Sequence, residues 1–415
     1  MKRRTLRFLA AGAVFLLLLA GMTARLTWVL SDKFAYKYHG EFYEREEQYD
    51  VLLFGSSHMM NSLLPLEMFE ERGIRAFNLG MTNESLAASY WRLRDALNRC
   101  TPQVVVVEAS MVTFGRKVDT ADPNAMALLH NSLDSMPLGA VKVQAVTDLF
   151  GAGDLENIFQ YLVPLAVCHN RWYALTEDDF HPWQQADRGA LPIRNLYMPE
   201  NEPILHSDGQ AEPPAVGREY LTRILTLCEQ RGVPVVLLNV PYFTQEHDLQ
   251  VFNALPELTA GYKNVRCINL FQTDFADWRG DFSDAAGHLN TAAAARLSRW
   301  LANDLAEFYQ LPDHRGEDGA QRWEQDMGIS TLQHWNKLLG AADLNTALML
   351  ADHTRLACRV RLGEEALQNE QTALLAGRLP DRGEPPPGSP ELPEEGCALL
   401  VWRTDSDEPA VLLQY

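Results

Sequence analysis

The sequence predicts an α/β protein with a doubly wound parallel sheet, preceded by a transmembrane helix and followed by a small α+β appendage. Three observations predict this architecture. An uncharged stretch lies near the N-terminus, short apolar runs alternate with amphipathic stretches over residues 45–310, and the pattern changes after residue 312. Strands that read as continuous apolar runs between helices are typical of a parallel sheet covered on both faces.

The first thirty residues predict a membrane-spanning helix. A basic start is followed by residues 8–23, which carry no charge, and an apolar stretch resumes at 26–30 after Arg25. Sixteen residues rise about 24 Å as a helix, and an Arg near a helix end can reach the headgroups. Both a retained anchor and a cleaved signal peptide are consistent with this segment. Met22 lies where a signal-peptide cleavage site requires a small residue, which favours the retained anchor. The basic start predicts that the chain after residue 30 is extracytoplasmic, on a single-pass protein of the cell membrane.

Five strands and four helices are expected in the α/β domain, which we place at residues 31–311. The predicted strands are 51–54, 75–79, 104–107, 233–240 and 265–270, and the predicted helices are 65–71, 84–98, 220–230 and 291–308. The alternation lapses in an insertion at about 112–217. Such an insertion forms either a lid or wall of the site or a packing elaboration.

Residues 312–415 are predicted to form the small accessory domain. We expect helices at 331–339 and 364–379, strands at 346–351, 398–402 and 411–413, and a turn at 405–408. A linker dense in proline runs from Pro380 to Pro393. No catalytic constellation is visible in this part of the sequence.

Composition and motifs exclude several classes of function. With 36 Lys and Arg against 55 Asp and Glu, the net charge is −19, whereas nucleic-acid binding needs a clustered basic surface. The sequence contains no HExxH, no P-loop and no GxGxxG after a strand. A metalloprotease, an NTPase and a Rossmann dehydrogenase therefore lack support, and neither a metal nor a cofactor is predicted.

Polar residues at the ends of the predicted strands carry the parts for acyl transfer. In a parallel sheet, ligands bind beyond the carboxyl ends of the strands. Ser57 follows the first strand in a tight glycine turn, Gly80 follows the second, and Asp284 and His288 precede the last helix. In acyl transfer a serine attacks, a His takes its proton, an Asp orients the His and backbone N–H groups hold the oxyanion.

These residues make the chain resemble the SGNH (GDSL-type) hydrolase superfamily over residues 48–310. Gly55-Ser56-Ser57-His58 is similar to its first block, with Ser57 at the nucleophile, and Asn78-Leu79-Gly80 is similar to the second. Asp284 with His288-Leu289-Asn290 resembles the last block, which supplies acid and base. The resemblance implies a flavodoxin-like three-layer fold, and an oxyanion hole formed by the N–H groups of Ser57 and Gly80.

The Gly-Ser-Ser variant, the anchor and the His-Leu-Asn ending are similar to the envelope-associated branch of this superfamily. That branch includes proteins of the teichoic-acid D-alanylation and alginate O-acetylation type. The resemblance implies an extracytoplasmic serine esterase or O-acyltransferase that acts on acyl esters, by default acetyl esters, of a cell-envelope polysaccharide. A membrane-bound acyltransferase is a further candidate partner.

Two departures from the family pattern leave alternatives open. The third block usually offers an Asn to the oxyanion; here Ser110 is closest to its place, and Asn83 is a candidate substitute. Asp284 lies four residues before His288 where three is usual, so Asp281 is an alternative orienting carboxylate. Both departures also suit a second function, a non-catalytic SGNH-like scaffold that binds a glycan or a membrane acyltransferase.

Three further residues are candidates for the surroundings of the site. His169 and Arg171, in the insertion, are candidate substrate contacts if the insertion folds over the site. His58 directly follows Ser57, and successive residues in a turn rarely share a direction. We therefore expect His58 to lie outside the triad.

Overall fold

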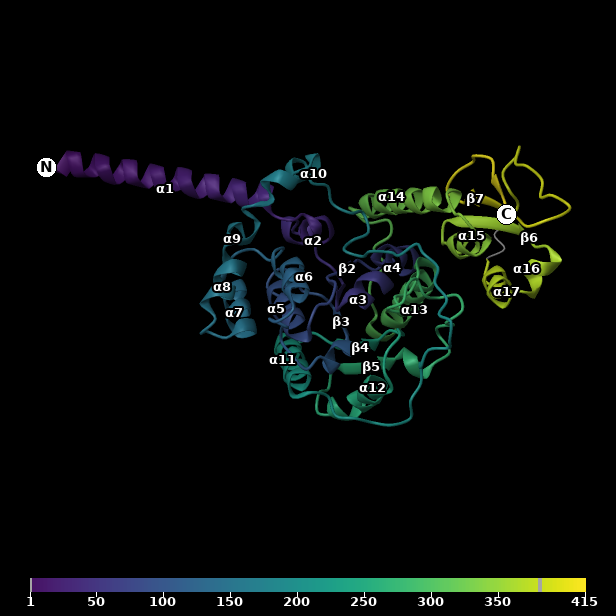
Figure 1. The fold of residues 1–415 in the computed structure, drawn as a ribbon, viewed down its shortest axis with the longest axis horizontal. Coiled ribbons are helices and arrows are strands. Elements are labelled where there is room, and N and C mark those ends of the chain that lie inside the picture. The colour runs from purple at the N-terminus through teal and green to yellow at the C-terminus, as the bar shows by residue number, and fades with distance from the viewer. Residues whose placement is uncertain (1, 380–382) are drawn as a thin grey trace. The chain divides into compact units, whose positions relative to one another are not determined.

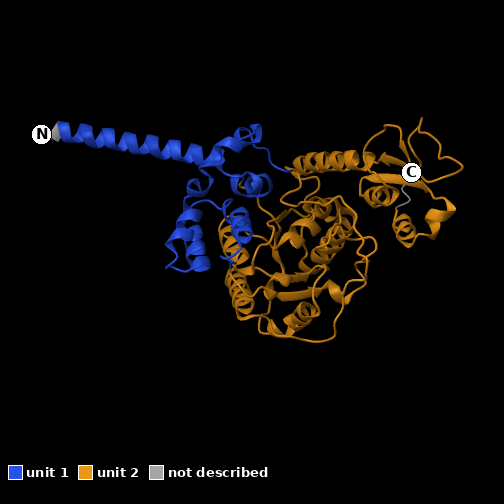
Figure 2. Ribbon diagram, viewed as in Figure 1, with its two compact units in different colours: residues 1–45, 118–185 blue, residues 46–117, 186–415 orange. Residues whose placement is uncertain are grey.

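The structure is a computed structural model that describes residues 2–379 and 383–415 (Figure 1). It divides into two compact units (Figure 2). Unit 1 comprises Met1–Arg45 and Val118–Gln185, and unit 2 comprises Glu46–Lys117 and Ala186–Tyr415. The predicted boundaries followed changes in composition, whereas this division follows contacts, so most of the predicted insertion belongs with the N-terminal helix. Pro380 of the predicted linker lies outside the described residues.

All the described secondary-structure elements of unit 1 are helices. Its elements are α1 (Lys2–Leu30), α2 (Phe34–Glu44), α6 (Pro123–Leu133), α7 (Ala140–Phe150), α8 (Leu155–Leu162), α9 (Leu165–Cys168), the 3₁₀ helix η2 (Arg171–Ala174) and α10 (Glu177–Phe180). Among the described residues, α1 is the one helix long and apolar enough to cross a membrane, over Arg4–Leu30. A signal sequence near the N-terminus also meets these criteria of length and composition.

Unit 2 contains a five-stranded parallel sheet. Its strands are β1 (Val51–Phe54), β2 (Ala76–Asn78), β3 (Val104–Glu108), β4 (Val235–Asn239) and β5 (Val265–Asn269). They lie in the order β2-β1-β3-β4-β5, with Leu53 opposite Val106 and Val106 opposite Val236. This is the strand order of one of the common doubly wound folds, in which the chain reverses its direction of travel between β1 and β3. The predicted strands are confirmed to within a few residues.

Helices cover both faces of this sheet, as Figure 1 shows. They are α3 (Ser57–Ser62), α4 (Pro65–Arg72), α5 (Leu86–Ala96), η1 (Ala109–Thr113), α11 (Ala215–Arg231), α12 (Glu246–Leu258), η3 (Leu270–Gln272) and α13 (Thr291–Tyr309). Helices α5 and α11 pack together on one side, and α4 and α13 pack together on the other. Burial on both faces explains why β1 and the four valines of β3 are apolar.

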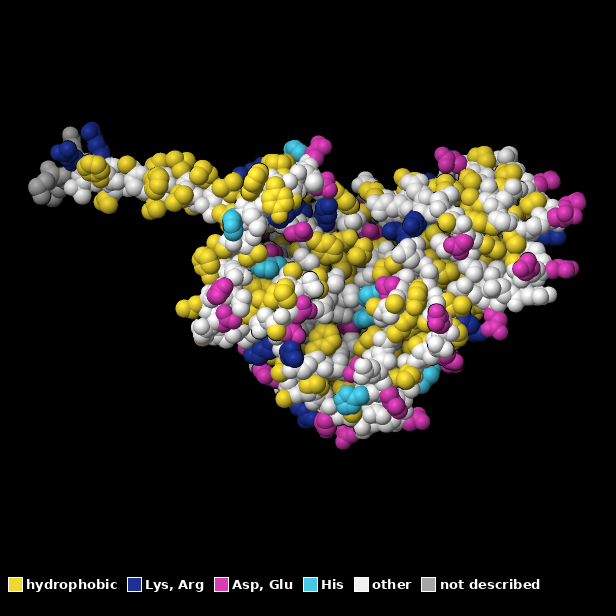
Figure 3. Space-filling model, in the orientation of Figure 1, with side chains coloured by type: hydrophobic (Ala, Val, Ile, Leu, Met, Phe, Trp, Pro, Cys, Tyr) yellow, Lys and Arg dark blue, Asp and Glu magenta, His cyan; other side chains and the backbone are white. Residues whose placement is uncertain are grey.

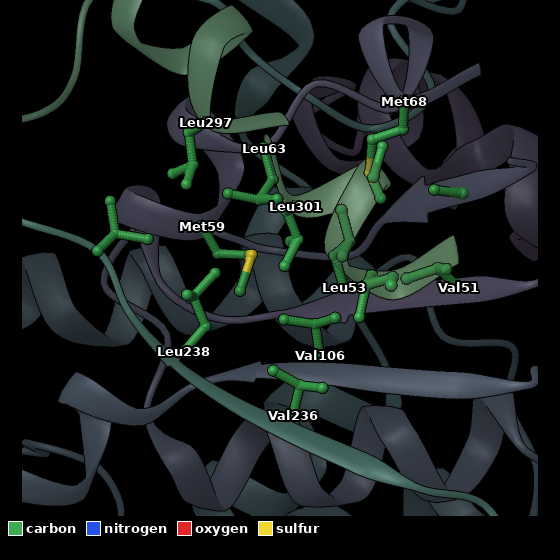
Figure 4. Packing of buried hydrophobic residues seen from close by; sticks show 14 of the residues in the cluster. Val51, Leu53, Met59, Leu63, Met68, Val106, Val236, Leu238, Leu297 and Leu301 are labelled. Carbon is green, nitrogen blue, oxygen red and sulfur yellow. The ribbon is translucent and has the colours of Figure 1, made fainter. Parts of the chain in front are cut away.

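The main core lies between the sheet and the α3–α4–α13 layer (Figure 4). Alternate strand residues, including Leu53, Val106 and Val236, face this layer. They meet Met59 of α3 and Leu297 of α13, and all five side chains are fully buried. The core therefore fixes β1 and α3, which flank the predicted nucleophile Ser57, and α13, which follows the predicted base His288.

The C-terminal part of unit 2 is a small α+β module. It contains α14 (Ala320–Leu339), α15 (Leu344–Ala351), β6 (Leu356–Arg361), α16 (Glu364–Gln368), α17 (Glu370–Gly377), β7 (Ala398–Arg403) and β8 (Val411–Gln414). The three strands form an antiparallel sheet in the order β6-β7-β8. Its apolar core includes Ala292, from the first turn of α13, so the module is continuous with the α/β domain.

One element prediction is wrong: residues 346–351 are helical, not a strand. They belong to α15, whose eight residues include five that are fully buried. A short, uniformly apolar run does not distinguish a strand from a buried helix by its period. The deciding signals were Asp343, whose side chain caps Thr346 N–H, and the helix formers Leu, Ala and Met that follow it. Strand β6 and helices α3 and α12 were not predicted.

Candidate active site

Ser57 lies at the first position of α3, directly after the turn that leaves β1. Gly55 is required in this turn, because a Cβ there would lie 2.5 Å from Met59 Cβ and 2.6 Å from Glu108 Oε2. Ser56 caps the helix by accepting a hydrogen bond from His58 N–H at 3.3 Å. The turn therefore presents the Ser57 hydroxyl at the carboxyl edge of the sheet.

His288 connects Ser57 to Asp284. Its Nε2 lies 2.8 Å from Ser57 Oγ, and its Nδ1 lies 2.7 Å from Asp284 Oδ2. Asp284 also accepts hydrogen bonds from the backbone N–H groups of Ala286 and His288. Burial alone raises the pKa of Asp284, but these bonds and the attraction of His288 outweigh it, so the pKa lies below its usual value. The carboxylate form is thereby favoured beside the imidazole.

Asp281, the alternative orienting carboxylate, has a different role. Its fully buried side chain pairs with Arg378 at 2.6 Å and with Arg296, and it accepts a hydrogen bond from Asp277 N–H at 2.7 Å. It therefore anchors the base of the loop that carries Asp284 and His288. The spacing of four residues works because Asp284 forms a turn that brings its carboxylate onto the ring of His288.

Glu108 braces the serine turn from the end of β3. Its carboxylate accepts hydrogen bonds from Ser56 N–H at 2.7 Å and Met59 N–H at 3.2 Å, and from the hydroxyls of Ser56 and Ser110. Burial raises the pKa of Glu108, and the four donors oppose that rise only in part. Ser110, the residue closest to the place of the third-block Asn, therefore donates its hydroxyl hydrogen bond to Glu108. A glutamate that ends a run of four valines was the sequence signal for this brace.

The loop after β2 is held by the buried side chain of Asn78. Asn78 Nδ2 donates to the carbonyls of Met59 and Leu63, and Asn78 Oδ1 accepts a hydrogen bond from Gly80 N–H at 2.8 Å. A Cβ at Gly80 would lie 2.7 Å from Met60 N, so glycine is needed for this close approach. The Gly80 N–H thus already has an intramolecular acceptor. Asn83 is exposed and has a left-handed backbone conformation, with φ of 54°.

His58 does not point away from the triad. Its ring stacks on His288, with centroids 4.5 Å apart, and on Tyr242 at 4.2 Å. Burial, followed by repulsion from His288, lowers the pKa of His58 to about 3. The expectation that successive side chains diverge failed because Ser57 and His58 begin a helix, where His58 turns toward the His288 loop. His58 is outside the hydrogen-bonded triad, as predicted, but its ring packs directly against the ring of His288.

His169 and Arg171 belong to unit 1, where both have local partners. His169 is exposed, and its Nδ1 lies 2.9 Å from Ala166 O. Arg171 donates to Leu30 O at 2.7 Å and pairs with Asp179 at 3.0 Å. A substrate contact by either residue stays a prediction. Among the described residues, no cluster of three or more His, Cys, Asp or Glu side chains is arranged to hold a metal ion.

No protein-family model matches the chain, and neither the curated proteins nor the solved structures contain a significant match. The geometry of the site brings together three residues from two segments of the chain, Ser57 from the β1–α3 turn and Asp284 and His288 from the loop before α13.

Proposed function

We propose that this protein is a membrane-anchored, extracytoplasmic serine esterase or O-acyltransferase of the SGNH type, acting on acyl esters of a cell-envelope polysaccharide. The observation that carries the proposal is the continuous chain from Ser57 Oγ through His288 to Asp284, at 2.8 and 2.7 Å. Both distances fall within hydrogen-bond reach of a nucleophile, its base and the group that orients the base.

In the first step, Ser57 Oγ attacks the carbonyl carbon of the ester while His288 Nε2 takes its proton. Asp284 holds His288 in the required tautomer and stabilises the imidazolium. The tetrahedral intermediate collapses when the C–O bond to the alcohol breaks, and His288 gives its proton to the leaving oxygen. The products are a free sugar hydroxyl and an acyl-Ser57 ester.

In the second step, water or an acceptor hydroxyl attacks acyl-Ser57, and His288 again serves as base. Ser57 is at the N-terminus of α3, where the first N–H groups have no partner within the helix and favour negative charge. The Ser57 N–H is therefore our primary oxyanion donor. Gly80 N–H becomes a second donor if an oxyanion competes with Asn78 Oδ1 for it, and Asn83 stays a candidate third.

A fluorophosphonate probe tests the proposal on the full-length protein in detergent micelles. We expect wild type to be labelled and Ser57→Ala to lose labelling completely, because the probe reacts only with an activated serine. Ser207→Ala is the matched control, since this loop hydroxyl makes one long hydrogen bond of 3.4 Å, to Glu246, and should leave labelling unchanged. Labelling that survives in Ser57→Ala would contradict the mechanism.

A second candidate function is favoured by the oxyanion region. The third block offers no Asn donor, Ser110 at the nearest position donates its hydroxyl to Glu108, and the Gly80 N–H is bonded to Asn78. Loss of one oxyanion donor costs on the order of 100- to 1000-fold in rate. A folded wild type that the probe does not label would favour the non-catalytic scaffold, which binds a glycan or a membrane acyltransferase.

A further inference from the structure

Two cationic side chains, those of Lys33 and Arg171, bind the C-terminal end of α1 to the rest of unit 1. The ammonium group of Lys33 donates to the carbonyls of Trp28, Val29 and Ser31, the last at 2.7 Å. The guanidinium of Arg171, far along the chain, donates to Leu30 O at 2.7 Å. These bonds satisfy carbonyl groups that a helix end leaves without partners, and positive charge there complements the helix dipole. Residues 28–33 are therefore held within the folded unit.

Asp179 links the two cations. It lies 3.0 Å from Arg171 and 4.0 Å from Lys33, and only 5% of the Asp179 and Lys33 side chains is exposed. Cys168 Sγ, in α9, contacts Ser31 Oγ at 3.8 Å. Three segments of the insertion, near residues 168, 171 and 179, are thus fixed at the level where α1 ends.

Large apolar side chains next to these anchoring residues are exposed. Trp172 and Tyr173 follow Arg171 and are 71% and 74% exposed, Phe180 follows Asp179, and Val167 precedes Cys168. Of nineteen exposed large apolar side chains outside α1 in the described residues, nine lie within 118–185. They are Leu138, Val143, Leu155, Phe159, Val167, Trp172, Tyr173, Phe180 and Trp183. Figure 3 shows apolar side chains along α1 and on the helices beside its end.

The length of α1 gives the depth of these residues. A span of 27 residues rises about 40 Å, against about 30 Å for the hydrocarbon core of a bilayer. With α1 as a retained span and the chain after residue 30 extracytoplasmic, the end of the uncharged run at Ala24 would place the turns from Arg25 to Leu30 in the outer headgroup layer. An apolar pocket of about 530 Å³ opens at this level, with walls that include Thr23, Trp28, Leu138 and Leu162.

We propose that unit 1 is a lipid-binding module whose exposed aromatic face rests in the outer leaflet around α1. Trp and Tyr are the side chains enriched at membrane–water interfaces, and a cluster of exposed apolar residues marks an interaction surface. The apolar residues come from α7, α8, α9, η2 and α10 and from the loops that contain Leu138 and Trp183, and not from one groove, which suits fluid lipid better than a protein partner of fixed shape. The inference rests on α1 as a retained membrane span and is independent of the chemistry at Ser57.

Quenching of tryptophan fluorescence by brominated lipid tests this contact in the intact protein. The full-length chain is placed in phosphatidylcholine nanodiscs with and without bromine on the acyl chains. The contribution of Trp172 is obtained by subtracting the Trp172→Phe spectrum from that of wild type. We expect this contribution to be blue-shifted and to lose at least half its intensity in brominated discs.

Trp300→Phe is the matched control, because Trp300 is an exposed tryptophan of unit 2, at 41%. Its difference spectrum should be equally intense in both kinds of disc. If the Trp172 contribution is not quenched, unit 1 does not contact lipid, and its apolar face is then left for a protein partner. If the protein does not co-elute with the discs, α1 is not a membrane anchor. Either result overturns the inference. Neither result changes the outcome expected from the fluorophosphonate experiment on Ser57.

Discussion

His58 shows how a single residue sets the electrostatics of the candidate site. Its ring separates His288 from Tyr242, and its Nδ1 is buried and has no hydrogen-bond partner in the described part of the chain. Burial and the neighbouring His288 lower its pKa to about 3, so it is neutral wherever the triad can work. A neutral ring leaves His288 free to become positively charged during acyl transfer without repulsion from its neighbour.

The same pKa predicts how stability depends on pH. Unfolded, His58 binds a proton below about pH 6.5, but in the folded protein it stays neutral down to about pH 3. The unfolded state therefore binds more protons in this window, and the free energy of unfolding falls as the pH is lowered, by up to about 1.4 kcal/mol per pH unit. We expect His58→Phe, which keeps the stacking, to flatten this slope in urea titrations between pH 7 and 4.

His169→Phe is the control for this titration, because His169 is exposed on unit 1. It should retain the slope of the wild type. A His58→Phe slope equal to that of the wild type would show that His58 is not held neutral by its surroundings.

At the scale of elements, α13 joins the core to the loop that carries Asp284 and His288. Asn290 caps this helix by accepting a hydrogen bond from Ala293 N–H, and its Nδ2 donates to Gly280 O, which closes the base of the loop. Leu297 and Leu301 of α13 are fully buried against the sheet. The position of His288 therefore depends on how well α13 packs.

We expect Leu301→Ala to lower the free energy of unfolding by about 2–5 kcal/mol, because it removes a fully buried side chain and leaves a cavity. The change is measured by urea unfolding followed by circular dichroism. Leu332→Ala is the matched control: Leu332 is 46% exposed on α14, and the change should cost less than about 1 kcal/mol. Equal losses in both variants would contradict the core assigned to α13.

At the scale of the whole molecule, the C-terminal module supports the site. Arg378, which follows α17, pairs with buried Asp281 at 2.6 Å, and Gln371 of α17 donates to Arg279 O at 2.7 Å. Both contacts reach the segment that leads into the Asp284–His288 loop. We therefore assign this module, whose described residues show no catalytic constellation, a role in positioning the loop.

Arg378→Ala should slow fluorophosphonate labelling by on the order of 10- to 100-fold, because displacement of catalytic groups by about 1 Å has effects of this size. Arg378→Lys should recover part of the rate, since it restores a cation beside Asp281. Arg359→Ala is the control within the same module, where the exposed Arg359 pairs with the exposed Glu384. If Arg378→Ala is labelled at the wild-type rate, the module does not position the loop.

The sequence alone was enough to predict the five strands and the three polar segments that follow or precede them. Continuous apolar runs identify strands buried on both faces, and parallel strands place their carboxyl ends at one edge. Ser57, Asp284 and His288 were found in this way because local turn chemistry determines where each lies. The choice between Asp281 and Asp284 was not determined, because both are acidic residues in the same loop.

Only the tertiary structure decided which groups are partners. The order β2-β1-β3-β4-β5, the contact of His58 with His288 and the hydrogen bond from Asn78 Nδ2 to the carbonyl of Met59 each depend on segments that are separated in the sequence. The association of residues 118–185 with α1 was decided in the same way. Periodicity reports which side of an element is buried, whereas partners depend on packing between distant segments.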